Sequence, residues 1–309
     1  MNSPRRPETT RSGAQANTLL IVLILLIVAL IVVLLTCHHQ QQDDTISNTG
    51  NSNTTNTHKT TNTNKNTPTD HHPIDTAALA RLELPQARAG DEIIQHRGYT
   101  LCYREAAEQA AWVAYVATAA HALGDHTERT NRFRTDPLVT TGSATNADYE
   151  GSGYDRGHLA PAEDMGWSKK TMSESFYYSN MSPQVPAFNR GVWKRLEELL
   201  RYWATEYDSI YIVTGPLLRD GLPAIGPDRV LVPAYFYKVV LVYNSGGVKA
   251  VGFLLPNEAS DATLRRFIVP VDTVEARTGL DFFPRLPDDV EAKVEGRADA
   301  GEWKWTRQE

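Results

Sequence analysis

The side chains best suited to chemistry in this sequence lie in Asp155-Arg-Gly-His158, which follows the glycine-containing stretch Gly151-Ser-Gly-Tyr. An imidazole most readily takes up a proton near neutral pH, so His158 could act as a general base. Arg156 offers a planar fork that suits phosphate oxygens. Farther along, the amide Asn189 and the carboxylate Glu197 are separated by roughly two helical turns. This combination suits phosphate chemistry at a metal ion.

Hydrolysis of a phosphodiester needs a base for water, a cation that stabilises developing charge, and fixed donors that hold the phosphate. Asn189 provides a hard oxygen for Mg²⁺, for which Mn²⁺ could substitute, and Glu197 could hold a water of that ion. Each residue also has a structural alternative. His158 could be a hydrogen-bonded core residue behind an Asp155–Arg156 pair, Asn189 a helix cap, and Glu197 a solvated helix residue. Their joint occurrence is what favours catalysis.

Both strands and helices are expected around these residues. Expected strands cover 93–103 with a glycine turn, 112–117, 209–214, 235–243 and 248–255, the last two joined by a hairpin. The alanines near 112–117 also suit a helix. Helices are expected at 168–178 and, from apolar spacing, at about 190–207, whereas 263–277 mixes both signals. The acidic end after Pro287 is predicted to be peripheral. The pattern predicts an α+β domain with a central antiparallel sheet flanked by helices.

The N-terminal region has a different composition. Residues 1–18 are polar, with three arginines and one acid, and an unbroken apolar run follows and reaches Cys37. This run is long enough to cross a bilayer, so we predict an uncleaved transmembrane anchor at 19–37. The basic residues before it place 1–18 in the cytoplasm and the rest of the chain outside, in the periplasm or the extracellular space if the source is bacterial. A cleaved secretory signal and a lipoprotein site at Cys37 are the alternatives.

Residues 38–73 are nearly all Asn, Thr, Ser, Gln and His. They contain too little apolar surface to offset the entropy of ordering, so we predict a disordered linker. Residues 74–309 then form the catalytic domain. The two cysteines, Cys37 and Cys102, define no disulfide framework.

Net charge bears on the partner. The whole chain is −6, and residues 1–73 hold five basic and four acidic side chains, so the domain itself is still more acidic. A protein that holds DNA tightly is normally basic on one face. Basic residues do gather near the motifs, but acids nearly match them in number. The expected binding of DNA or RNA is therefore weak, salt-sensitive and independent of sequence.

Several segments, in this order, resemble the DNA/RNA non-specific endonuclease family, which includes Serratia-type and endonuclease G-like nucleases. They are Trp112–Tyr115, Phe133–Asp136, Ala144–Pro161, Ser179–Gln184, Asn189–Glu197 and Val271–Phe283. The resemblance spans most of the domain. It implies a ββα-metal (His-Me finger) active site and a metal-dependent phosphodiester hydrolase.

The resemblance also implies a role for each matching residue. His158 would be the general base, and Asn189 the one direct protein ligand of a Mg²⁺ otherwise held by water. Glu197 would fix that water shell, and Asn180 would help to order the site. Arg156 would hold the scissile phosphate or steady the site beside it.

An upstream arginine should stabilise the transition state, and Arg129 is the first choice, with Arg132 left open because loop length varies there. The products would carry 5′-phosphate and 3′-hydroxyl ends, and a homodimer is an option. Two other functions stay open at this point: a catalytically weak nucleic-acid-binding module at the surface, and hydrolysis of another kind of phosphodiester.

Overall fold

The computed structural model describes residues 81–307 and 309. The predicted tail, anchor, linker and domain start lie outside the described residues. Within 81–307 and 309, no helix has both the length and the apolar character needed to cross a membrane.

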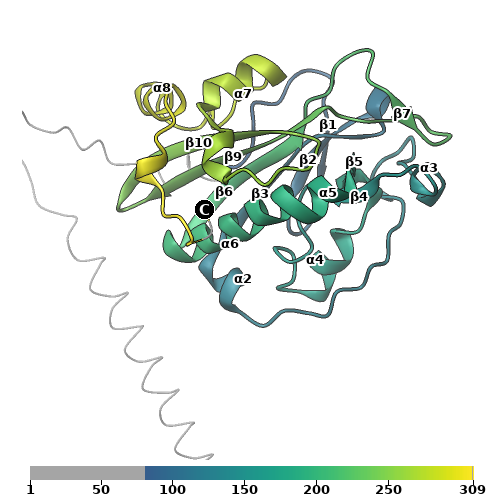
Figure 1. Cartoon of the computed structure of the whole chain (residues 1–309), viewed down its shortest axis with the longest axis horizontal. Coiled ribbons are helices and arrows are strands. Elements are labelled where there is room, and N and C mark those ends of the chain that lie inside the picture. The colour runs from purple at the N-terminus through teal and green to yellow at the C-terminus, as the bar shows by residue number, and fades with distance from the viewer. Residues whose placement is uncertain (1–80, 308) are drawn as a thin grey trace, which may run out of the picture. The chain divides into compact units, whose positions relative to one another are not determined.

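A seven-stranded sheet occupies the centre of the described region (Figure 1). In spatial order it contains β1 (Glu92–Gln95), β2 (Thr100–Arg104), β3 (Gln109–Thr118), β6 (Ser209–Pro216), β9 (Tyr235–Asn244), β10 (Gly247–Pro256) and β11 (Ile268–Val269). Every neighbouring pair is antiparallel. The central antiparallel sheet is thus confirmed, and 112–117 is part of a strand despite its alanines.

The sheet separates two apolar layers because side chains of a strand alternate between its faces. On β3, Val113 and Tyr115 pack with α6 (Lys194–Glu206) on one face. Trp112 packs on the other face, with α7 (Val271–Thr278) and α8 (Asp288–Glu295). Figure 1 shows α7 and α8 together on one side of the sheet and α6 on the opposite side. The sheet is therefore covered on both faces.

The remaining helices and strands are short. They are α2 (Ala119–Leu123), α3 (Asn146–Tyr149), β4 (Asp155–His158), α4 (Lys169–Glu174), β5 (Met181–Gln184), α5 (Pro186–Phe188), β7 (Ala224–Ile225) and β8 (Val230–Leu231). β4 and β5 form an antiparallel pair in which His158 faces Met181 in register. The chain then passes through α5 and a π-helical turn, Asn189–Trp193, into α6. Two strands followed by a helix are the arrangement that the family resemblance implies.

The prediction that the C-terminal end is peripheral was wrong. Trp303 is only 4% exposed and stacks on Trp203 of α6, with ring centroids 4.2 Å apart. The indole Nε1 of Trp203 donates a hydrogen bond to the carbonyl of Lys304. The acidic composition of this segment obscured its tryptophans, which complete the core around α6.

Candidate active site

β4 presents Arg156 and His158 on the same face, because they are two positions apart on a strand. Gly157 lies within the strand and not in a bend. A glycine is needed at this position because a Cβ would clash with the side chain of Gln184 on β5. The turn precedes the strand, where Gly153 has a φ of +83°.

His158 lies between two phenylalanine rings and is 9% exposed. Its ring meets Phe176 edge-on at 5.0 Å between centroids and Phe133 at 5.9 Å. Its Nε2 is buried and has no hydrogen-bond partner among the described residues. The alternative of a hydrogen-bonded core histidine is therefore not what the structure shows. Burial, and secondarily the charge of Arg129, lower the pKa of His158 to about 3, so the ring is uncharged near neutral pH and free to accept a proton.

Arg129 lies on the same aromatic pair. Its guanidinium is 5.1 Å from the centroid of Phe176, and its Nε donates to Oδ1 of Asn131 at 2.8 Å. By contrast, the exposed Arg132 makes its described contact through its backbone carbonyl, which accepts from Arg134. The geometry favours Arg129 over Arg132 as the residue near His158, and its catalytic role stays a prediction.

Arg156 covers the other ring. Its guanidinium lies 4.7 Å from the centroid of Phe133, and its Nη1 donates to Oδ1 of Asn146 at 2.6 Å. Neither Arg156 nor Arg129 forms an ion pair with another described residue. Two unpaired cations beside a neutral imidazole form a favourable position for an anion such as a phosphodiester.

The amide of Asn189 is oriented by Asp155. Its Nδ2 donates to Oδ2 of Asp155 at 2.9 Å, and that carboxylate is also held by Arg190 through bonds of 2.8 and 2.7 Å. The Asp155–Arg156 pair is therefore wrong for this structure. Asn189 does end α5 as its C-cap residue, but its side-chain amide donates to Asp155 and does not cap a helix. The amide Oδ1 accepts no hydrogen bond from the described residues, so a hard donor is left over for a cation. The orienting role of Asp155 was missed, although the residue lies in the motif itself.

The stretch from Asn189 to Glu197 is not one continuous helix. In a regular α-helix, eight positions rotate by about 800°, which is about 80° past two full turns. Gly191 interrupts the stretch with φ and ψ both −109°, so a kink joins two helical pieces within Asn189–Trp193. The kink, and not regular helical spacing, therefore sets how the amide and the carboxylate are aligned.

Glu197 is partly buried beside the fully buried Lys238. Burial raises the pKa of Glu197 to about 8, Lys238 opposes this shift, and the carboxylate of Asp164 adds to it. Burial lowers the pKa of Lys238 to about 8, while Glu197 opposes that change. Lys238 Nζ donates to the carbonyl of Leu159 at 3.3 Å and to Thr214 at 3.2 Å. The sequence does contain a clue, a single lysine in the apolar strand β9, but the partners of that lysine are distant in sequence.

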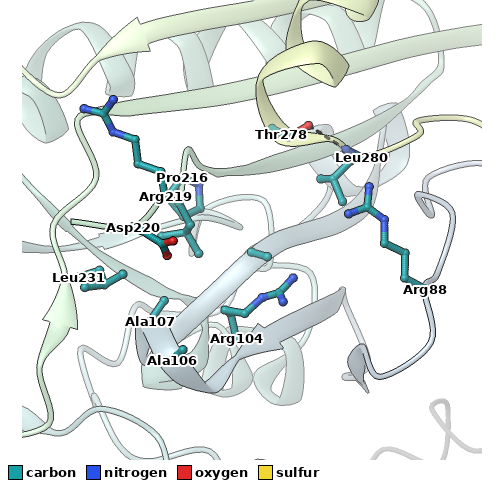
Figure 2. Close-up of a pocket in the computed structure, with 12 residues that line it drawn as sticks. Arg88, Arg104, Ala106, Ala107, Pro216, Arg219, Asp220, Leu231, Thr278 and Leu280 are labelled. Carbon is teal, nitrogen blue, oxygen red and sulfur yellow. Dashed lines mark hydrogen bonds between the residues drawn. The ribbon is translucent and has the colours of Figure 1, made fainter. Parts of the chain in front are cut away.

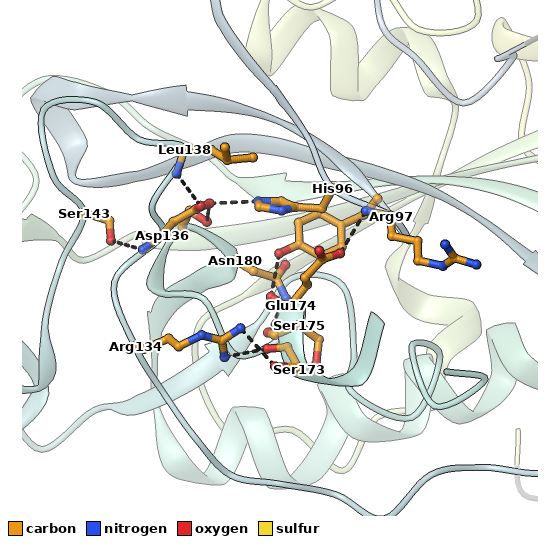
Figure 3. Close-up of polar contacts among 12 residues, drawn as sticks. His96, Arg97, Arg134, Asp136, Leu138, Ser143, Ser173, Glu174, Ser175 and Asn180 are labelled. Atoms are coloured by element: carbon orange, nitrogen blue, oxygen red, sulfur yellow. Dashed lines mark hydrogen bonds and ion pairs between the residues drawn. The ribbon is translucent and has the colours of Figure 1, made fainter. Parts of the chain in front are cut away.

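Asn180 holds backbone rather than a ligand. It is fully buried, its Oδ1 accepts from the amide of Ala160, and its Nδ2 donates to the carbonyls of Ala160 and Ser175, all at 2.9 Å. Figure 3 shows it close to the polar network in which Asp136 meets the ring of His96 at 2.8 Å. These bonds tie the chain after β4 to the end of α4, which supports the predicted ordering role.

A cavity of about 350 Å³ lies elsewhere on the described domain (Figure 2). Arg88, Arg104 and Arg219 contribute to its lining, which contains none of the predicted site residues. The candidate active site is therefore separate from this cavity.

Comparison with known proteins identifies the chain's relatives. The sequence profile for DNA/RNA non-specific endonuclease matches residues 77–289. The chain belongs to the DNA/RNA non-specific endonuclease family. Members of this family are nucleic-acid-hydrolysing enzymes that generally depend on a metal, so this endonuclease is an enzyme of that class.

Individual relatives agree with this assignment. Human mitochondrial endonuclease G is 37% identical over 209 residues, covering 63% of this endonuclease and 70% of the relative. Nuclease C1 of Cunninghamella echinulata var. echinulata is 38% identical over 214 residues, covering 63% and 84%. A crystal structure of the EndoG/EndoGI complex matches with a TM-score of 0.61 and 33% identity, covering 65% of this endonuclease and 89% of the solved chain.

Proposed function

We propose that this endonuclease hydrolyses both DNA and RNA without sequence preference, depends on Mg²⁺ with Mn²⁺ able to substitute, and leaves 5′-phosphate and 3′-hydroxyl ends. One observation carries the proposal. The uncharged His158, which makes no hydrogen bond through Nε2, lies near the guanidiniums of Arg129 and Arg156. The same strand holds Asp155, whose carboxylate orients the amide of Asn189.

The residues present fit a hard divalent cation. Asn189 offers a free amide oxygen, and Glu197 can hold a water of the ion rather than the ion itself. When bound, Mg²⁺ would stabilise negative charge on the leaving 3′ oxygen. Arg156 and Arg129 would bind the non-bridging phosphate oxygens, and His158 would take the proton of the attacking water.

Substrate binding would also adjust the basicity of His158. In the free protein, burial and the charge of Arg129 keep its pKa low. The negative charge of a phosphate beside Arg129 offsets the positive charge of that arginine, so the pKa of His158 rises as the substrate binds. The base then gains proton affinity when the attacking water is in place. The attacking water forms the new P–O bond opposite the 3′ oxygen, the bond from phosphorus to that oxygen breaks, and the 3′ oxygen leaves and takes up a proton, so the phosphate stays on the 5′ oxygen.

We also propose that residues 19–37 anchor the enzyme in a membrane, with the catalytic domain outside the cytoplasm. Length, apolar composition and the arginines before the segment support this. Carbonate extraction and protease accessibility of intact cells test it. A full-length chain in the soluble fraction, or a domain protected from added protease, would refute it.

The function is tested with the full-length chain in mild detergent, incubated with closed-circular plasmid or total RNA, with Mg²⁺ or with EDTA. We expect cleavage of both polymers, abolished by EDTA. His158→Ala should lose cleavage but retain binding in a gel-shift assay. Products should be religated by DNA ligase without kinase treatment if they carry the proposed ends. A folded preparation that cleaves neither polymer under any divalent ion would refute the proposal.

A further inference from the structure

Three carboxylates converge between α7 and α8, on the face of the sheet opposite to α6. Asp272 and Glu275 come from α7 and Glu295 from α8, and Figure 1 shows the two helices side by side. One carboxylate oxygen from each lies within 4.8 Å of the others. Two oxygens that each lie about 2.4 Å from an ion are at most about 4.8 Å apart, and each pair in this cluster meets that condition.

Glu295 is the residue that points to a ligand. It is 4% exposed, and its Oε1 is buried without a hydrogen-bond partner among the described residues. Oε1 of Glu291, on the same helix, is also buried and unpartnered. A buried carboxylate without a partner is costly unless it binds a proton or a cation.

The charges around Glu295 give it no compensation. Burial raises its pKa to about 9, and the neighbours that add to the shift, Glu275, Glu291, Asp272 and Asp281, are all acids. In the part of the chain that the structure describes, no Lys, Arg or His forms an ion pair with any of these five carboxylates. Among the described residues no protein cation balances the cluster, so the charge is relieved either by a bound cation or by a proton.

The cluster lies next to the C-terminal end of α8. Oδ2 of Asp272 lies 3.5 Å from the position that a Cβ on Gly296 would occupy, and Gly296 is the C-cap of α8. The last carbonyl groups of a helix lack intrahelical partners and carry the negative end of its dipole. Asp272 is exposed and Glu275 partly exposed, which leaves an entry path and room for water ligands.

We propose that Asp272, Glu275 and Glu295 bind Ca²⁺, which joins α7 to α8 at a site separate from the catalytic one. Calcium accepts six to eight oxygen ligands in flexible geometry, which suits carboxylates supplemented by water and backbone carbonyls. Oε1 of Glu275 accepts a hydrogen bond from the backbone amide of Phe282 at 2.8 Å, and its other carboxylate oxygen remains available to bind the ion. The competing explanation is a proton held by Glu295 in place of the cation.

The test uses the full-length chain with Asn189→Ala, because that substitution removes the expected catalytic ligand. Thermal unfolding and isothermal titration calorimetry are measured with CaCl₂ and after chelation. We expect saturating Ca²⁺ to raise the Tm by roughly 5 °C, with one ion bound per chain. Asn189→Ala/Glu295→Gln should lose both effects. Asn189→Ala/Glu258→Gln, which neutralises an exposed acid outside the cluster, should keep them.

Glu295→Gln should not prevent folding, because the neutral amide resembles the protonated acid in shape. The proposal is overturned if Ca²⁺ leaves the Tm of Asn189→Ala unchanged, or if the shift persists after Glu295→Gln. No response to Ca²⁺, with a higher metal-free Tm for the Glu295→Gln variant, would show that the cluster holds a proton instead.

Discussion

Replacing Asp155 by alanine tests how the candidate metal ligand is oriented. Asp155 fixes the amide of Asn189 by accepting from Nδ2 at 2.9 Å, which leaves Oδ1 as the donor for a cation. Without the carboxylate, the amide is free to rotate or to turn its NH₂ group toward the ion. We therefore expect Asp155→Ala to raise the Mg²⁺ concentration for half-maximal cleavage.

The magnitude follows from the contact. A hydrogen bond to a charged group contributes about 1.5–3 kcal/mol, and Asp155 is 17% exposed, so some screening applies. Loss of a group that orients a metal ligand typically costs about 10–100-fold, or about 1.4–2.7 kcal/mol, in metal affinity or activity. We expect a requirement for Mg²⁺ that is about 10–100-fold higher.

The assay is the initial rate of plasmid nicking as a function of Mg²⁺ concentration. Arg190→Gln is the matched control, because it removes the 73% exposed partner of Asp155 and keeps the bond to Asn189. That variant should shift the Mg²⁺ requirement by less than about threefold. An unchanged requirement in Asp155→Ala, or an equal shift in Arg190→Gln, would refute the orienting role.

Three further predictions concern the same site. Arg129→Ala should lower the cleavage rate at saturating Mg²⁺ by about 100–1,000-fold, whereas Arg132→Ala should change it only a few-fold; equal losses would contradict the assignment. The pKa of metal-free Glu197 is about 8, so protons compete with the ion below that pH. The Mg²⁺ concentration required for half-maximal cleavage should therefore rise by up to about tenfold for each pH unit below 8. Glu197→Gln should flatten this pH profile. Lys238→Met removes the cation that opposes the raised pKa of Glu197, so the same profile should move to higher pH; an unmoved profile would exclude that coupling.

The sequence predicted the residues of the site better than the elements that hold them. The helix expected at about 190–207 corresponds to α6, but β4, β5 and the turn at Asn189–Trp193 were not predicted as elements, because they are too short to show a periodic pattern. His158, Asn189 and Glu197 were still recognised together, since they lie close to one another in the chain. The strands of the sheet were also recognisable, since β-branched and aromatic residues dominate them. The sequence predicted that these strands form a central antiparallel sheet, but it did not predict which strands are neighbours.

Contacts between distant residues could not be predicted in this way. Asp155 has basic neighbours in Arg156 and Arg190, and the choice between them depends on which face of β4 meets the start of α6. Lys238 influences Glu197 because the fold brings its Nζ onto the ring of Trp193, next to the start of α6. The burial of Trp303 likewise depends on where the chain returns after α8.

The position of the catalytic segment in the topology has a consequence for folding. β3 and β6 are neighbours in the sheet, yet residues 119–208, which carry all the site residues predicted from the sequence, lie between them in the chain. Their pairing must close a loop of roughly 90 residues, whereas the β9–β10 hairpin closes locally. We therefore expect the hairpin to form early and the junction of β3 with β6 late. A nascent or partly folded chain would then lack an assembled site, so the late closure delays nuclease activity until the domain is complete.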